Sequence, residues 1–250
     1  MEKTILIAGK DFPYGRDFAS GALLKRNSVI ITCDKENNDL PSGDGSVNIV
    51  WNKASSLSSR SLVLSSMNVK GRLDEVVLYF DEELFAPKFG NPCSKESLQC
   101  FDELILSYQY LTSEILLRFN QRKNAGLQNK IQKIVFIYKS NPSVYESVFS
   151  QELKNSAKTL SKALVASAAS AFKAFAQNIA ASLIDSAEII PLLVECAPDN
   201  EFYNNDSDFS RWLCDYMDEL DESKKSLTEK QKLSWIKAGS KLPGKFSLFK

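Results

Sequence analysis

The sequence contains no histidine among its 250 residues. Histidine is the side chain that changes charge near neutral pH, and it is the commonest general base and metal ligand. Its absence excludes Ser-His-Asp and Cys-His catalysis. The five cysteines, at positions 33, 93, 100, 196 and 214, include no Cys-x-x-Cys pair. We therefore expect buried, reduced thiols and no bound metal.

The sequence also lacks an excess of charge of either sign, because Lys+Arg and Asp+Glu both number 31. Without a basic field, we expect neither nucleic acid nor an anionic membrane as a partner. No apolar run approaches the roughly 20 residues that a membrane span needs. The short apolar run that follows Lys3 lacks the length of a signal-peptide core. A cytoplasmic location is therefore expected.

What the sequence does contain is an alternation of short apolar runs with longer amphipathic segments. Six runs are rich in β-branched residues and nearly continuous in apolar character, which is typical of strands buried on both faces of a parallel sheet. These runs are 4–8, 28–32, 47–51, 75–80, 133–138 and 189–194. Since no linker divides the chain, we expect one α/β domain over residues 1–250. Its doubly wound, Rossmann-like parallel sheet would lie between two layers of helices.

Two long helical segments lie between these runs. Residues 97–119 and 148–184 repeat apolar side chains at three-to-four spacing. Shorter helices are expected at 55–66 and 209–220, and residues 245–249 are the candidate for a seventh, edge strand.

Gly9, Pro13 and Gly15 follow the first run at a distinctive spacing. This stretch resembles the cofactor-binding turn Thr-Gly-x-x-x-Gly-x-Gly of the short-chain dehydrogenases/reductases. Gly9 matches the first glycine and Gly15 the third, but Pro13 stands at the middle one. Glycine lets the backbone approach a pyrophosphate closely, whereas proline has no N–H and cannot adopt positive φ. The turn is therefore either a degenerate NAD(H) site or a strand-to-helix turn that binds nothing.

Two further positions extend this resemblance to the cofactor site. Asp34 ends the second strand, where the family selects between NAD(H) and NADP(H), and an acid there implies NAD(H). Asn52 roughly occupies the position of the family's adenine-contacting aspartate. If a dinucleotide binds at all, the resemblance implies that these two residues contact it together with Gly9 and Gly15.

The family's catalytic Tyr-x-x-x-Lys motif is missing. Residues 166–183 resemble the helix that bears it, and counting back places Val165 at the tyrosine position and Ala169 at the lysine position. None of the eight tyrosines has a lysine four residues later. Valine and alanine transfer no protons, so the resemblance implies the fold without its usual carbonyl reduction. Lys173, one turn farther along, is expected to be exposed.

Three functions remain open from the sequence. The first is a catalytically silent homologue that acts as a binding or scaffold protein for an unknown protein partner. The second is an NAD(H)-dependent oxidoreductase of altered mechanism, with Tyr138, Lys139 and Ser140 as candidate catalytic residues. These three follow the fifth strand, where open α/β sheets bind their ligands. The third is a nucleotide sensor without turnover.

The resemblance also implies a homodimer. In the family, the two corresponding long helices form a four-helix bundle between subunits. Residues 161–182 are dominated by Ala and Ser, which allow helices to approach closely. We therefore expect a homo-oligomer through helices 97–120 and 148–184, unless these small residues pack only against the chain's own sheet.

Overall fold

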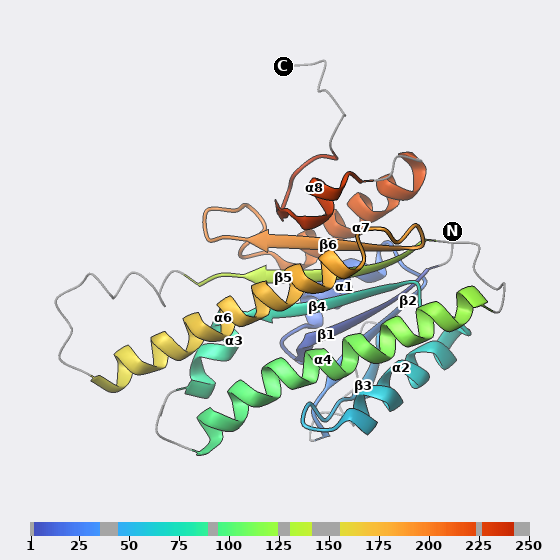
Figure 1. The fold of residues 1–250 in the computed structure, drawn as a ribbon. Coiled ribbons are helices and arrows are strands. Elements are labelled where there is room, and N and C mark those ends of the chain that lie inside the picture. Colours follow the sequence, from blue (N-terminus) through green and yellow to red (C-terminus); the bar gives the residue numbers. More distant parts are fainter. Residues whose placement is uncertain are drawn as a thin grey trace, which may run out of the picture.

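The computed structural model describes residues 3–35, 45–89, 95–124, 131–141, 156–223 and 227–242. Within these ranges, seven strands form one parallel sheet in the order β3-β2-β1-β4-β5-β6-β7 (Figure 1). The strands are β1 (Thr4–Phe12), β2 (Ser28–Cys33), β3 (Val47–Val50), β4 (Glu75–Asp81), β5 (Gln132–Lys139), β6 (Ile189–Cys196) and β7 (Trp235–Lys237). The strand order changes direction between β1 and β4, which confirms the predicted doubly wound sheet.

Helices cover both faces of this sheet (Figure 1). On one face lie α2 (Ser56–Lys70), α4 (Lys95–Asn124) and α6 (Ser156–Ser182). On the other lie α1 (Arg16–Leu23) and α7 (Asp206–Ser223). The short elements are α3 (Glu82–Phe85), the 3-10 helix η2 (Ala86–Phe89) and α8 (Glu229–Leu233). The predicted three-layer α/β/α arrangement is therefore confirmed.

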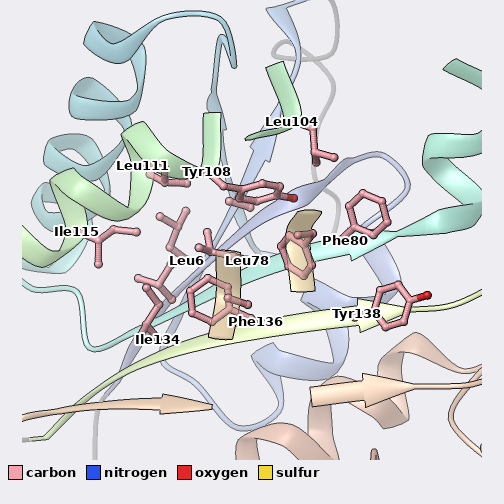
Figure 2. Packing of buried hydrophobic residues seen from close by; sticks show 14 of the residues in the cluster. Leu6, Leu78, Phe80, Leu104, Tyr108, Leu111, Ile115, Ile134, Phe136 and Tyr138 are labelled. Atoms are coloured by element: carbon pink, nitrogen blue, oxygen red, sulfur yellow. The ribbon is translucent and has the colours of Figure 1, made fainter. Parts of the chain in front are cut away.

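Each face of the sheet buries its own apolar core. Figure 2 shows Leu6, Leu78 and Phe136, from three neighbouring strands, on the face where Tyr108 and Leu111 of α4 pack. Alternate residues of the same strands point to the opposite core, beneath α1 and α7. The strands are apolar almost throughout because both of their faces are covered.

The helices lie where the sequence predicts them, but the residues at which they begin or end differ from the predicted ones. The helix expected at 55–66 continues to Lys70, because the first residue to leave the helical conformation is Gly71, at φ 70°. The helix expected at 148–184 is observed as α6; residues 148–155 lie outside the described part of the chain.

The described sheet has a seventh strand that the sequence did not predict. It is Trp235–Lys237, which pairs in parallel with β6 from Leu193 onward. A strand of three residues is too short to give a recognisable apolar run. Residues 245–249, where a seventh strand was expected, lie outside the described ranges. Pro191 precedes the ladder to β7, so its missing N–H removes no hydrogen bond on that side.

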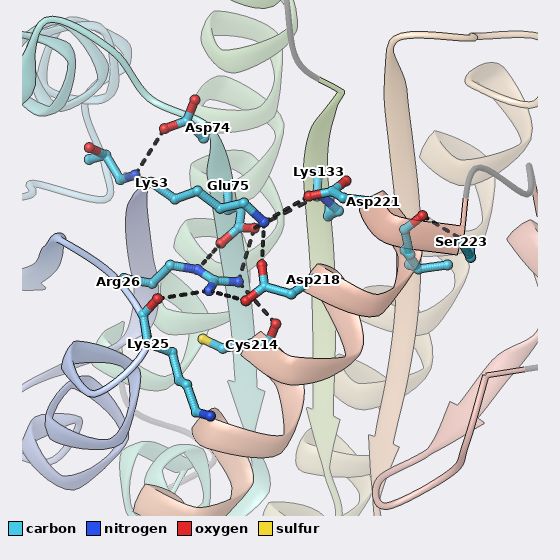
Figure 3. Close-up of polar contacts among 12 residues, drawn as sticks. Lys3, Lys25, Arg26, Asp74, Glu75, Lys133, Cys214, Asp218, Asp221 and Ser223 are labelled. Carbon is cyan, nitrogen blue, oxygen red and sulfur yellow. Dashed lines mark hydrogen bonds and ion pairs between the residues drawn. The ribbon is translucent and has the colours of Figure 1, made fainter. Parts of the chain in front are cut away.

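A buried salt bridge joins the amino ends of the central strands to the loop before β2 (Figure 3). The Arg26 Nε atom lies 2.6 Å from Glu75 Oε2, and its Nη2 atom lies 3.1 Å from Glu75 Oε1. Both side chains are 1% exposed. Arg26 Nη2 also donates to the Cys214 carbonyl of α7. Arg26 therefore links β4, through the two-point contact with Glu75, to α7, through the Cys214 carbonyl.

Further charges surround this pair. Lys3 and Lys133 place their Nζ atoms 3.3 Å and 3.9 Å from Glu75 Oε1. Their other contacts are with α7: Lys133 Nζ lies 2.6 Å from Asp221, and Lys3 pairs with both Asp218 and Asp221. Three cations and three carboxylates therefore neutralise one another at this end of the sheet (Figure 3).

We expect this network to make the fold sensitive to acid. Burial alone would raise the pKa of Asp218, but Lys3 and Arg26 outweigh burial and hold that pKa below its usual value. The ionised carboxylate therefore stabilises the fold above the unfolded-state pKa of about 4, and this stability is lost as the pH falls through the folded-state pKa. Urea unfolding at neutral and acidic pH measures the effect.

The matched variants for this test are Asp218→Asn and Asp215→Asn. Asp215 pairs with Lys25 at the surface of the same helix. We expect Asp218→Asn to lose stability at neutral pH and to show a flatter dependence on acid than the wild type. Parallel curves for the wild type and Asp218→Asn would contradict this assignment.

Candidate functional site

The first strand does not end at Gly9. After an irregularity in its pairing, β1 continues to Phe12, which lies opposite Cys33 of β2. Gly9 lies within the strand at φ 97°, and α1 begins only at Arg16. The strand-to-helix turn is therefore shorter than expected: it comprises only residues 13–15, after an irregular stretch of strand that contains Gly9.

The side chain of Tyr108 covers Gly9. Its hydroxyl, which comes from α4, donates a hydrogen bond of 2.5 Å to the Tyr79 carbonyl of β4. A Cβ atom on Gly9 would lie 2.1 Å from the Tyr108 hydroxyl oxygen and 2.3 Å from the Tyr79 carbonyl oxygen. Burial raises the pKa of Tyr108 well above its usual value, so the hydroxyl keeps its proton. Gly9 makes room here for the chain's own tyrosine.

Gly15 also has a packing role. Its φ is −86°, which any residue adopts. A Cβ atom there would lie 2.1 Å from the Lys10 carbonyl oxygen and 2.8 Å from Ile31 Cδ1. The glycine therefore lets the start of α1 lie directly against β1 and β2.

Asp34 and Asn52, the other predicted cofactor contacts, are exposed. The Asn52 side chain accepts a hydrogen bond from the backbone N–H of Ala54, 3.1 Å away, and so closes a local turn. The structure places these two residues near the ends of β2 and β3, at the same edge of the sheet as Gly9. It does not bring either side chain onto Gly9.

A half-buried aspartate that sequence reasoning missed lies at this edge. Asp11 accepts hydrogen bonds from the Thr32 hydroxyl and the Lys53 ammonium. Burial alone would raise the pKa of Asp11, but Lys53 and the two hydrogen bonds outweigh burial and hold it below its usual value. Asp11 lies inside the variable part of the turn motif, so no residue pattern identifies it.

Two lysines and two aspartates form a cluster at the carboxyl ends of β1, β4 and β5. Lys10 Nζ lies 2.9 Å from Asp81 Oδ2 and also pairs with Asp206, the first residue of α7. Lys139 Nζ lies 3.1 Å from the other oxygen of Asp206. Burial alone would lower the pKa of Lys10, but Asp81 and Asp206 outweigh it and raise that pKa. The four charges therefore neutralise one another at this edge of the sheet.

The thiols of the described cysteines are not activated. Cys33, Cys196 and Cys214 are buried and form no disulfide, as predicted for these three. Burial raises the pKa of Cys196 to about 11 and that of Cys214 to about 12. Thiols with such values stay protonated at neutral pH and are poor nucleophiles.

The three candidate catalytic residues make contacts in different places. Successive residues of a strand point to opposite faces. The Tyr138 hydroxyl donates to Glu82 Oε1 at 2.6 Å on the α6 side, while Lys139 joins Asp206 on the α7 side. The Ser140 N–H donates to the Cys196 carbonyl. The structure therefore does not assemble Tyr138, Lys139 and Ser140 into one site.

The positions that resemble the family's Tyr and Lys lie in the core. Val165 and Ala169 are 1% and 2% exposed. Lys173 was expected to be exposed, but it is half-buried. Its Nζ atom lies 4.4 Å from the centre of the Tyr138 ring and 3.0 Å from Glu195 Oε1. The long side chain reaches from α6 across the end of β5, which helical spacing alone does not reveal.

Neither a metal centre nor a membrane helix is found in the part of the chain that the structure describes. Within these ranges, no three Cys, Asp or Glu side chains gather as metal ligands would. No described helix is both long and apolar enough to cross a bilayer.

No protein-family model matches the sequence, and no curated protein matches it. Solved structures, in contrast, match nearly the whole chain. A short-chain dehydrogenase from Mycobacterium smegmatis is 16% identical with a TM-score of 0.58, and the match covers 96% of this chain and 92% of that one. A short-chain dehydrogenase from Streptomyces avermitilis is 16% identical with a TM-score of 0.57, covering 96% and 89%.

A third match was solved with a bound cofactor. It is the 3-ketoacyl-(acyl-carrier-protein) reductase from Brucella melitensis complexed with NADH. It is 13% identical with a TM-score of 0.56, and the match covers 94% of this chain and 96% of that one. The chain therefore has the fold of the short-chain dehydrogenases/reductases, as its sequence resemblance predicted.

Proposed function

We propose that this protein is a cytoplasmic, catalytically silent homologue of the short-chain dehydrogenases/reductases that acts as a binding or scaffold protein for a protein partner. The observation that carries the proposal is the position of Tyr108, whose hydroxyl lies over Gly9 where this fold admits a pyrophosphate. The free thiols of Cys33, Cys196 and Cys214 support a reducing compartment.

The energetics of displacing Tyr108 support this proposal. For a dinucleotide to reach Gly9, the buried Tyr108 ring would have to leave the core, at about 1.5–3 kcal/mol. The Tyr79 carbonyl would lose its hydrogen-bond donor, at about 1–3 kcal/mol. Together these terms correspond to a roughly 100-fold or greater loss of affinity.

The charge cluster opposes the binding of a dinucleotide at the same edge of the sheet. Lys10 and Lys139 are the cations that a pyrophosphate would seek, but Asp81 and Asp206 already neutralise them. A phosphate that displaced either carboxylate would leave it partly buried beside another anion. Removal of one partner from such a pair is strongly unfavourable.

The residues at the family's catalytic positions also support the absence of catalysis. Val165 and Ala169 offer no group that donates or accepts a proton, and both are packed in the core. The Tyr138 and Lys173 pair is the observation that favours the alternative, an NAD(H)-dependent oxidoreductase of altered mechanism. Under that alternative, the Tyr138 hydroxyl would have to leave Glu82 before it could reach a substrate.

Calorimetric titration with NAD⁺, NADH, NADP⁺ and NADPH tests the proposal. We expect no heat of binding and no shift in melting temperature at millimolar ligand. Binding with hydride transfer to a panel of carbonyl compounds would favour the oxidoreductase, and binding without turnover would favour a nucleotide sensor. Either result would reject the proposal. If binding occurs, Asp34→Ala and Asn52→Ala test whether it uses the predicted contacts.

The proposal includes a homodimer through α4 and α6, over residues 97–120 and the described part of 148–184. Leu106 and Leu117 lie on the outer side of α4 and are 46% and 47% exposed. We expect a dimer mass in sedimentation equilibrium, and a monomer when both leucines are replaced by glutamate. A wild-type protein that stays monomeric at every concentration would contradict the dimer.

A further inference from the structure

Two aromatic rings and a carboxylate form a corner at the carboxyl end of the sheet. Tyr138 is the last residue but one of β5, Glu195 lies opposite it on β6, and Trp235 begins β7. The Tyr138 and Trp235 ring centres are 6.3 Å apart, and their planes meet at 73°. We call Tyr138, Trp235 and Glu195 the aromatic cage. Figure 2 shows Tyr138 at the end of β5, with its hydroxyl pointing away from the other labelled core side chains.

The Tyr138 ring is held in place from behind. Its hydroxyl donates to Glu82 Oε1 at 2.6 Å, and the other Glu82 oxygen accepts the Asn141 N–H at 2.7 Å. Phe80 stacks on the same ring at 6.3 Å between centres. A ring fixed in this way presents its face to the corner before any ligand arrives, which reduces the entropy lost on binding.

The corner is filled by a cation of the chain itself. Lys173 Nζ lies 4.4 Å from the Tyr138 ring centre, 5.3 Å from the Trp235 ring centre and 3.0 Å from Glu195 Oε1. Two ring faces and one carboxylate around an ammonium are the arrangement by which proteins recognise alkylated ammonium groups. The Trp235 Nε1 atom is buried and has no hydrogen-bond partner among the described residues.

We propose that the aromatic cage is a binding site for a trimethylammonium group, and that Lys173 is its tethered, displaceable occupant. Glu195 supplies the negative charge, and the rings of Tyr138 and Trp235 supply the cation–π contacts. The Lys173 side chain is 32% exposed, so it reaches water without unfolding α6. The proposal does not depend on whether the chain binds a dinucleotide.

The lysine ammonium and the trimethylammonium group differ in hydration. This difference explains why a trimethylammonium ligand would displace Lys173 from the aromatic cage. A lysine ammonium is a compact, strongly hydrated charge, and it satisfies its three N–H groups better in water than against aromatic rings. A trimethylammonium group has no N–H, and its methyl groups contact the rings directly. Lys173 resists displacement through its tether, which acts as a local concentration in the millimolar range.

Two sources carry this group, a choline-type small molecule and the side chain of a trimethylated lysine. Titrations with choline and with Nα-acetyl-Nε-trimethyllysine methylamide distinguish them. The indole N–H resonance of Trp235, assigned by Trp235→Phe, reports binding by NMR. The neutral isostere 3,3-dimethylbutanol is the matched ligand control, because it has the same shape without the charge.

We expect Lys173→Ala to bind at least one of the two cationic probes about tenfold more tightly than the wild type, because the tethered competitor is gone. Adding Glu195→Gln to Lys173→Ala should weaken that binding about tenfold, since a partly desolvated charge partner is lost. The two replaced side chains are 32% and 35% exposed, so the fold should persist, which circular dichroism checks. The neutral isostere should not bind.

Three results would overturn the proposal. The first is the absence of any shift of the Trp235 resonance in folded Lys173→Ala with either cationic probe at high millimolar concentration. The second is equal binding of choline and its neutral isostere, which would remove the role of charge. The third is equal affinity of the wild type and Lys173→Ala, which would show that Lys173 does not occupy the cage.

Discussion

Gly9→Ala is expected to destabilise the fold by about 2–5 kcal/mol in the absence of any ligand. Gly9 has φ 97°, a conformation that costs an alanine about 1–2 kcal/mol. The new Cβ atom would also lie 2.3 Å from the Tyr79 carbonyl oxygen, so the backbone of β4 would have to move. Overpacking of this kind costs about 1–3 kcal/mol. Urea unfolding measures the loss.

The control is Gly71→Ala, at the end of α2. Gly71 also has positive φ, at 70°, but a Cβ atom there meets nothing within 4 Å. We expect Gly71→Ala to cost only about 1 kcal/mol, the conformational term alone. If the two substitutions cost the same, then Tyr108 and Tyr79 do not crowd Gly9, and the account of the packing around Gly9 fails.

Arg26→Ala should destabilise the fold by about 3–5 kcal/mol, because it leaves the buried Glu75 carboxylate without its two-point partner. Lys3 and Lys133 lie 3.3 Å and 3.9 Å from Glu75 Oε1 and offset only part of the loss. The hydrogen bond from Arg26 Nη2 to the Cys214 carbonyl of α7 is lost with the same side chain. Chemical denaturation at neutral pH measures the change.

Lys25→Ala provides the matched comparison for Arg26→Ala. Lys25 is the neighbouring residue and pairs with Asp215 at 2.8 Å, but the two side chains are 35% and 50% exposed. We expect this substitution to cost less than about 1 kcal/mol. A loss in Arg26→Ala no larger than that in Lys25→Ala would mean that the buried network does not stabilise the fold.

The fold was predictable because strands and helices leave local signals. The β-branched runs at β1, β2, β4 and β5 identify strands buried on both faces, and their alternation with helices predicts a parallel sheet. The absence of the Tyr-x-x-x-Lys motif could also be established from the sequence, because a motif on one helix is a local pattern. The strand Trp235–Lys237 was not predicted, because three residues are too few to show a hydrophobic periodicity.

The site was less predictable because its contacts join distant parts of the chain. Lys10, Asp81 and Asp206 come from β1, β4 and α7, and nothing local marks any of them as a partner of the others. Gly9 was predicted to let the backbone approach a pyrophosphate. In the structure, the absence of a side chain at Gly9 instead makes room for Tyr108. The half-buried position of Lys173 depends on the length of its side chain.

A structure of the protein crystallised with millimolar NADH tests the central claim most directly. We predict that the Tyr108 hydroxyl will still donate to the Tyr79 carbonyl, that Lys10 will still pair with Asp81, and that no dinucleotide will lie over Gly9. A dinucleotide bound there, with the Tyr108 ring turned out of the core, would contradict the proposal that Tyr108 occupies the place of the cofactor's pyrophosphate.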